Sequence, residues 1–211
     1  KRGMGLEKSL SIFDKIRKEV GVPVLTDVHT AEQCSMLANH VDVIQIPAYL
    51  CLQTELTTEA AKKGKIINIK KGQFLSPHDV EKVVLKIKSA GNDNITITER
   101  GTCFGYRDLM VDPRSFLILK KLNYPVFFDV GHSVRKNGFP SSNVKDGGQK
   151  EFGETYARAA ISNFVDGLFI EVHPDPKNAK CDAATQFSFN EFDNIMNNVK
   201  PLWDFVNLEQ K

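Results

Sequence analysis

Six short apolar runs recur along the chain, and each is rich in β-branched or aromatic residues. They cover residues 22–28, 43–48, 65–71, 95–100, 125–130 and 167–173. Because they are apolar through most of their length rather than alternating apolar and polar, they predict strands that are buried on both faces.

Segments with apolar residues three or four positions apart separate these runs and predict helices. The first such segment covers residues 6–20 and precedes the first run. Ser76 followed by Pro77 predicts a helix start, since serine is a good N-cap and proline is favoured in the first turn. Ser188 and Glu191 have the spacing of a capping box ahead of the last helix. This alternation of helix and strand predicts an α/β protein with parallel strands covered by helices.

Charged or hydrogen-bonding side chains appear at the C-terminal end of every run. The runs end in Asp27/His29, Gln45/Pro47, Lys70/Lys71, Glu99/Arg100, Asp129/His132 and Glu171/His173. An open doubly wound sheet places its site at one switch point, so only one or two strand ends need such residues. A closed (β/α)8 TIM barrel brings all strand ends to one rim, where its active site lies. The pattern therefore favours the barrel.

The number of strands is smaller than a barrel requires. A (β/α)8 barrel has eight strands in roughly 250 residues, and this sequence has six candidate strands in 211 residues. We therefore expect the first two strands of the barrel to be missing from this chain. No linker or shift in composition divides residues 1–211, so we expect a single barrel domain.

Composition narrows the class of protein. With 28 Lys+Arg and 26 Asp+Glu the net charge is +2, and 26% of the residues are charged, which argues against a disordered chain or a general nucleic-acid binder. No apolar run approaches the roughly 18 residues of a membrane span, and no signal peptide is evident at the start. The four cysteines form no CxxC pair. We expect a reduced, cytoplasmic protein with no nucleic-acid or membrane partner.

Three cations at neighbouring strand ends predict an anion site. Lys70, Lys71 and Arg100 could hold a phosphate or carboxylate, arginine through a bidentate fork and lysine as a point charge. The alternative, a solvated surface lysine, fits Lys71, whose side chain should point opposite to that of Lys70. It fits Arg100 poorly, because Arg100 closes an apolar run and precedes Gly101.

Histidine and carboxylate side chains follow the last two runs and suggest a metal site. They are His132, Glu171, His173 and Asp182, with Cys181 beside them. Imidazole with carboxylates suits first-row metals. Their spacing matches no local motif, so a satisfied core or surface histidine remains the alternative.

A polar, glycine-rich connection covers residues 131–153, and its residues 133–149 are the candidate lid. A loop this long inside a compact domain is typically either a lid or a solvated segment. Arg135, Lys136 and Lys145 could reach over a phosphorylated substrate, and a solvated mobile loop is an equal alternative.

Six motifs that occur in one order are highly specific together. They are Gln45-Ile-Pro-Ala-Tyr-Leu-Cys51, Asn68-Ile-Lys-Lys-Gly-Gln-Phe74, Thr98-Glu-Arg-Gly-Thr-Cys-Phe-Gly-Tyr106, Phe128-Asp-Val-Gly-His-Ser-Val134, Gly147-Gly-Gln-Lys-Glu-Phe152 and Glu171-Val-His-Pro-Asp-Pro176 with Cys181-Asp182. Over essentially its whole length the chain resembles the 3-deoxy-D-manno-octulosonate 8-phosphate synthases, also called 2-dehydro-3-deoxyphosphooctonate aldolases.

The resemblance implies a fold and an activity. The fold is a (β/α)8 barrel whose first two strands are absent from this sequence. The implied reaction condenses phosphoenolpyruvate with D-arabinose 5-phosphate and water, releasing phosphate, in lipopolysaccharide biosynthesis. A cytoplasmic homotetramer without an organic cofactor is implied as well.

Site residues follow from the resemblance position by position. It implies that Lys70 and Arg100 hold the phosphate and carboxylate of phosphoenolpyruvate and that Asp27 lies beside the sugar. The same pocket is expected to be lined by Gln45, Pro47, Ala48 and Gln73. The residues expected to take part in catalysis are Lys70, His132 and Asp27.

The motifs are closer to the metal-dependent subgroup of these synthases. The resemblance implies that His132, Glu171 and Asp182 are ligands of zinc, iron or manganese, with a cysteine of the missing first strand as the fourth ligand. His173 is then expected beside this set or near the sugar.

Two positions depart from the pattern of the family. Leu52 replaces an arginine that helps to hold the sugar phosphate, and Gly131 replaces a threonine before His132, where a looser backbone is expected. Two alternatives therefore stay open. One is the related synthase of the aromatic pathway, which uses erythrose 4-phosphate, and the other is a degenerate barrel that binds phosphorylated ligands without turnover.

Overall fold

A computed structural model describes residues 5–105, 108–140 and 142–208 of the chain. Tyr106 and Ser141, which belong to a motif and to the expected lid, lie outside the described residues. The chain divides into two compact units, residues 1–97 and 98–211. The prediction that residues 1–211 form one barrel domain stays a prediction.

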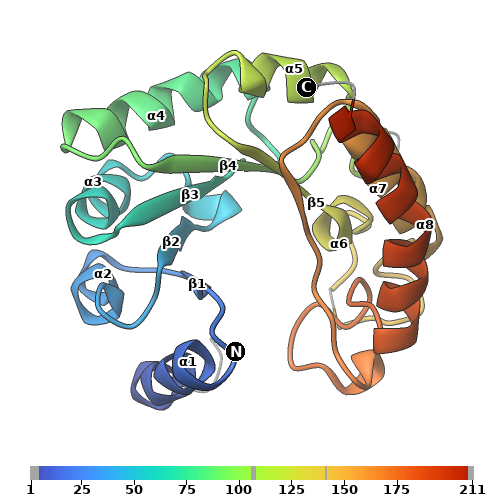
Figure 1. Ribbon diagram of the computed structural model, residues 1–211, viewed down its shortest axis with the longest axis horizontal. Coiled ribbons are helices and arrows are strands. Elements are labelled where there is room, and N and C mark those ends of the chain that lie inside the picture. Colours follow the sequence, from blue (N-terminus) through green and yellow to red (C-terminus); the bar gives the residue numbers. More distant parts are fainter. Residues whose placement is uncertain (1–4, 106–107, 141, 209–211) are drawn as a thin grey trace. The chain divides into compact units, whose positions relative to one another are not determined.

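The first unit alternates helices and parallel strands. Its elements are α1 (Leu6–Glu19), β1 (Leu25–Asp27), α2 (Ala31–Leu37), β2 (Val43–Ile46), α3 (Thr54–Lys63), β3 (Ile66–Lys70) and α4 (Val80–Ser89). Strand β1 pairs with β2 and β2 pairs with β3, both in parallel. Figure 1 shows α2 and α3 along one side of these strands.

The core of the first unit comes from alternate strand positions and from the facing helices. Ile44 and Ile46 of β2 and Ile67 and Ile69 of β3 are at most 1% exposed. The predicted start signal of α4 is confirmed, because the Ser76 side chain accepts a hydrogen bond from the backbone N–H of His78, with Pro77 in the first turn.

The second unit follows strand β4 (Ile95–Glu99), which crosses the boundary between the two units. Its elements are α5 (Arg114–Lys120), β5 (Val126–Asp129), α6 (Val130–Ser133), α7 (Gly153–Ser162), β6 (Gly167–Phe169) and α8 (Phe189–Leu208). Strand β5 pairs in parallel with β6. Helices α7 and α8 lie side by side (Figure 1).

Side-chain packing and a cap hold the second unit together. The rings of Phe116 and Phe128 pack edge to face at 5.6 Å. The predicted capping box is confirmed: Ser188 N–H donates to Glu191 Oε2 at 2.6 Å, and Glu191 N–H donates to Ser188 Oγ at 3.3 Å.

The strand order confirms the predicted class. Among the described residues there are six strands, and their order in the sheet is their order in the sequence. Strands in sequence order with a helix after each are the repeating pattern of a (β/α)8 barrel, whereas a doubly wound sheet reverses its order. Six of the eight strands of such a barrel are accounted for. None of the helices in these ranges is long and apolar enough to cross a membrane.

Several strands are shorter than their apolar runs. The last run was expected to be a strand over residues 167–173, yet β6 ends at Phe169. Beyond it, Val172 forms an isolated bridge with Phe187. The segment at Phe187 therefore forms the backbone hydrogen bonds there, with Glu171 and His173, that a neighbouring strand would otherwise form.

Candidate functional site

His132 is presented by a short helix that begins directly after β5. The Asp129 carboxylate caps this helix, α6, by accepting the His132 N–H at Oδ1 (2.9 Å). Its second oxygen, Oδ2, lies 2.9 Å from Nδ1 of the His132 ring. Because a carboxylate oxygen only accepts, this contact keeps the ring proton on Nδ1 and leaves the lone pair of Nε2 for a ligand.

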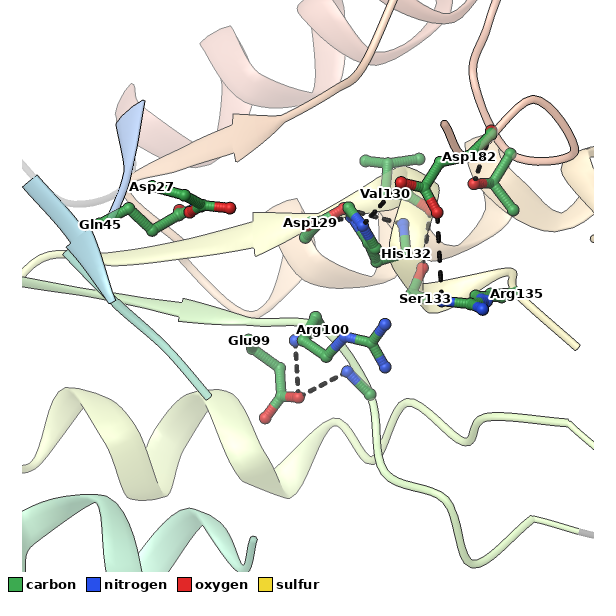
Figure 2. Close-up of polar contacts among 12 residues, drawn as sticks. Asp27, Gln45, Glu99, Arg100, Asp129, Val130, His132, Ser133, Arg135 and Asp182 are labelled. Atoms are coloured by element: carbon green, nitrogen blue, oxygen red, sulfur yellow. Dashed lines mark hydrogen bonds and ion pairs between the residues drawn. The ribbon is translucent and has the colours of Figure 1, made fainter. Parts of the chain in front are cut away.

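Glu171 and Asp182 come from the segment after β6. The backbone carbonyl of Glu171 accepts the Phe187 N–H at 3.0 Å, which holds this segment in an extended conformation. Asp182 has a φ of +49°, and its carbonyl accepts the N–H groups of Thr185 and Gln186. A tight turn therefore orients the Asp182 side chain toward His132 (Figure 2).

These three side chains form one cluster. One ligand atom from each of His132, Glu171 and Asp182 lies within 4.8 Å of the others. His132 Nε2 is 4.0 Å from Asp182 Oδ2, and a guanidinium nitrogen of Arg135 is 4.0 Å from Asp182 Oδ1. The grouping expected from the sequence is thus present within the second unit.

The donor set fits a divalent transition metal. One imidazole nitrogen and carboxylate oxygens are suitable ligands for zinc, iron or manganese. Two ligand atoms that each lie about 2.0–2.2 Å from the same metal are roughly 3–4 Å apart. The three ligand atoms here would need to move about 1 Å closer together to bind one metal ion. The Asp129–His132 contact is the carboxylate–histidine pairing that usually supports a metal-bound imidazole.

Gly131 lies in α6 directly before His132, and close packing of the chain explains why a small residue stands there. A Cβ atom at Gly131 would approach the Thr185 carbonyl oxygen to 3.1 Å. The turn that carries Asp182 therefore packs closely on the helix that carries His132. A side chain at position 131 would push the two apart.

The neighbouring His173 and Cys181 are not members of the cluster. His173 Nδ1 accepts the Asp175 N–H at 3.0 Å, so this ring stabilises a local turn. Burial, followed by the nearby charges of Asp182 and Glu171, raises the pKa of the Cys181 thiol. Cys181 is therefore more difficult to ionise than an ordinary cysteine.

Arg100 follows β4 and is only 3% exposed. The preceding Glu99 turns its carboxylate back and accepts the N–H groups of Arg100 (2.9 Å) and Gly101 (2.7 Å), as Figure 2 shows. Gly101 has a φ of +86°, which favours glycine, and its neighbour Thr102 exchanges two backbone hydrogen bonds with Met110. Glu99 thereby determines where the Arg100 backbone lies, a role that the sequence analysis did not assign.

Lys70 ends β3 in the first unit and is 4% exposed. The alternative of a solvated Lys71 is wrong, because its side chain is fully buried and donates to the carbonyl oxygens of Gly72 and Leu75, each at 3.2 Å. The segment after β3 folds back over Lys71 and supplies these carbonyls. Burial also raises the pKa of the nearby Cys51 thiol, although the Gly72 N–H and the charge of Lys71 act in the opposite direction.

The segments after β2 and β3 contact each other closely. A Cβ atom at Gly72 would lie 3.0 Å from the Ala48 carbonyl oxygen. This places the Pro47–Ala48 segment beside the turn that carries Gln73. Gln73 is 8% exposed, and its Oε1 atom has no hydrogen-bond partner in the described part of the chain.

Asp27 and Gln45 are side by side at the ends of β1 and β2 (Figure 2). Gln45 Nε2 donates to Asp27 Oδ1 at 2.5 Å. The structure therefore brings together Asp27 with Gln45 in the first unit, and His132 with Glu171 and Asp182 in the second. Leu52, the first departure from the family pattern, is 43% exposed, and the Lys86 ammonium donates to its carbonyl at 2.8 Å.

Comparison with known proteins gives consistent results over nearly the whole chain. It is 48% identical over 210 residues to a 2-dehydro-3-deoxyphosphooctonate aldolase of Bartonella quintana, which covers 100% of this chain and 74% of the relative. Proteins of the same name from Trichlorobacter lovleyi and Geotalea daltonii are 46% and 48% identical over 201 residues, 95% of this chain and 73% of each relative. The sequence model of the DAHP synthetase I family matches residues 1–204. On these matches, the chain belongs to the DAHP synthetase I family.

Proposed function

We propose that this protein condenses phosphoenolpyruvate with D-arabinose 5-phosphate and water to give 3-deoxy-D-manno-octulosonate 8-phosphate and inorganic phosphate. The observation that carries the proposal is the shared name of its relatives, 2-dehydro-3-deoxyphosphooctonate aldolase, at 46–48% identity over 95–100% of the chain. Within the cell, the product would serve lipopolysaccharide biosynthesis in the cytoplasm, and the active protein would be a homotetramer.

The reaction forms a carbon–carbon bond between the substrates and a carbon–oxygen bond to water, which gives up a proton, and it breaks the carbon–oxygen bond to the phosphate. The methylene carbon of phosphoenolpyruvate attacks the aldehyde carbon of the sugar, whose oxygen takes up a proton and becomes a hydroxyl. Water adds to the neighbouring carbon as positive charge develops there, and phosphate leaves from that carbon. Fixing both substrates reduces the entropy cost of this bimolecular step.

The buried cations would bind the donor substrate. Lys70 and Arg100 are 4% and 3% exposed, and charge-assisted contacts are strongest in such water-poor surroundings. They would hold the phosphate and carboxylate of phosphoenolpyruvate. The pocket around it would be completed by Gln45, Pro47, Ala48 and Gln73.

Asp27 and the metal ligands would each have a role in handling the acceptor sugar. Asp27 would accept a hydrogen bond from a sugar hydroxyl. A divalent metal, when bound by His132, Glu171 and Asp182, would polarise and orient the aldehyde oxygen. The chain's own contribution there is the Asp129 contact, which keeps His132 Nε2 free of a proton.

Two measurements test the proposal. The purified protein is incubated with phosphoenolpyruvate and either arabinose 5-phosphate or erythrose 4-phosphate, and loss of the enol absorbance and release of phosphate are followed. We expect turnover with arabinose 5-phosphate only. Turnover with erythrose 4-phosphate alone would favour the aromatic-pathway reaction, and binding without turnover would favour a degenerate barrel.

Metal dependence is tested on the same protein. The metal is removed with a chelator, and activity is assayed before and after adding manganese or zinc. We expect activity to disappear and then return. Full activity with no bound metal would refute the role proposed for His132, Glu171 and Asp182.

A further inference from the structure

A line of hydrogen-bonded polar side chains runs across β1, β2, β3 and the part of β4 that belongs to the first unit. Gln45 Nε2 donates to Asp27 Oδ1 at 2.5 Å, Asn68 Nδ2 donates to Gln45 Oε1 at 2.7 Å, and Thr96 Oγ1 donates to Asn68 Oδ1 at 2.9 Å. Asp27, Gln45 and Asn68 are direct register partners on β1, β2 and β3. They therefore point to the same face of the sheet.

The middle of this line is buried and its ends are more accessible. Gln45 is 5% and Asn68 is 2% exposed, whereas Thr96 is half-buried and Asp27 is exposed. A buried amide that loses a hydrogen bond is strongly destabilised. Buried polar networks that are well satisfied are correspondingly rigid.

The chemistry of the groups permits only one direction of donation. An Asp27 carboxylate only accepts, so Gln45 must present its NH₂ group to Asp27 and its carbonyl oxygen to Asn68. Asn68 must then present its NH₂ group to Gln45 and its carbonyl oxygen to Thr96. The Thr96 hydroxyl, which can donate or accept, completes the line as a donor.

We propose that Asn68 and Thr96 are positioning residues that act on Asp27 through Gln45. This inference rests on the proposed function, in which Asp27 binds a hydroxyl of the sugar. Gln45 occupies Asp27 Oδ1, and Oδ2 accepts no hydrogen bond from the described residues, so Oδ2 is the oxygen presented to the sugar. Thr96 determines this arrangement although it touches neither substrate.

The test removes the hydroxyl of Thr96 and leaves its shape. Thr96→Val deletes the donor and Thr96→Ser retains it. We expect Thr96→Val to raise KM for arabinose 5-phosphate or lower kcat by about three- to tenfold, with a smaller change in KM for phosphoenolpyruvate, whose pocket Gln45 also lines. Thr96→Ser should restore the wild-type values to within about twofold.

A matched control separates positioning from stability. Thr57 is fully buried in the first unit, whereas Thr96 is half-buried, and the Thr57 hydroxyl donates to the Gln53 carbonyl at 2.7 Å. Thr57→Val therefore removes a buried threonine hydroxyl elsewhere. Because Thr57 is the more buried of the two, we expect Thr57→Val to lower the urea midpoint at least as much as Thr96→Val does while leaving both KM values unchanged.

A double variant provides the decisive comparison. In an Asp27→Asn background, Thr96→Val should cause no further loss of activity, because the carboxylate that it orients is gone. An equal further loss in that background, or wild-type kinetics for Thr96→Val, would overturn the inference alone. A wild-type protein without turnover of arabinose 5-phosphate would instead overturn the proposed function, and the inference with it.

Discussion

Replacing Asp129 by asparagine should weaken metal binding without disturbing the fold. Asp129 is fully buried, and its two oxygens contact the backbone N–H and the ring Nδ1 of His132, each at 2.9 Å. Asparagine has the same size and can still accept the backbone N–H through its carbonyl oxygen. Its NH₂ group, however, then faces Nδ1.

The consequence for His132 is a change of tautomer. Opposite an NH₂ donor, Nδ1 favours the form that accepts, and the ring proton moves to Nε2. That proton occupies the lone pair with which His132 would bind the metal. Loss of such a supporting contact typically costs about 10- to 100-fold in metal affinity, which corresponds to about 1.4–2.7 kcal/mol.

The assay is calorimetric titration of the chelator-treated protein with manganese, together with thermal unfolding followed by circular dichroism. Asp112→Asn is the matched control, because Asp112 also accepts a backbone N–H at the start of a helix, from Arg114 at 3.0 Å. We expect weaker manganese binding for Asp129→Asn only. Equal manganese affinity of Asp129→Asn and the wild type would refute the argument.

Three further predictions concern the donor site, the loop and a helix cap. Lys70→Ala and Arg100→Ala should each abolish turnover by weakening phosphoenolpyruvate binding, by several kcal/mol for a buried charge-assisted contact; unchanged affinity by calorimetry would contradict this. The loop over residues 133–149 should become protease-resistant when both substrates bind, and equal cleavage with and without them would exclude a lid. Although burial acts in the opposite direction, hydrogen bonds from Lys150 and from the cap keep the pKa of Glu191 below its usual value. Glu191→Ala should therefore lower the free energy of unfolding by about 1 kcal/mol at pH 7. Because a lowered pKa stabilises the fold only while the carboxyl is ionised, this difference should vanish as the pH falls through that pKa, and urea unfolding at pH 7 and pH 3 checks it.

Much of the site could be predicted because the barrel pattern places functional groups at strand ends. His132, Glu171 and Asp182 are far apart in the sequence, yet each follows an apolar run or a turn near one. The motifs identified them, and their side chains converge within 4.8 Å. No local spacing rule could have given that distance, since it depends on how the turn at Asp182 packs on Gly131.

The errors share a physical cause. A solvated Lys71 fitted the sequence because its side chain was expected to point opposite to that of Lys70, but the following turn covers it with two carbonyl groups. The last strand ends at Phe169, and beyond it the returning chain pairs Val172 with Phe187. In both cases the hydrogen bonds come from residues outside the apolar run, in a segment that folds back on it.

The amino-acid sequence by itself determined the class of fold, since apolar runs and 3.6-residue periodicity are local properties of the chain. It also determined the helix starts at Ser76 and Ser188, whose caps involve neighbours within three residues. Only the tertiary structure decided that Asn68 and Thr96 connect to Asp27. A single polar residue in an apolar run has no defined partner until neighbouring strands set their register, and hydrogen-bond direction follows only once every partner is in place.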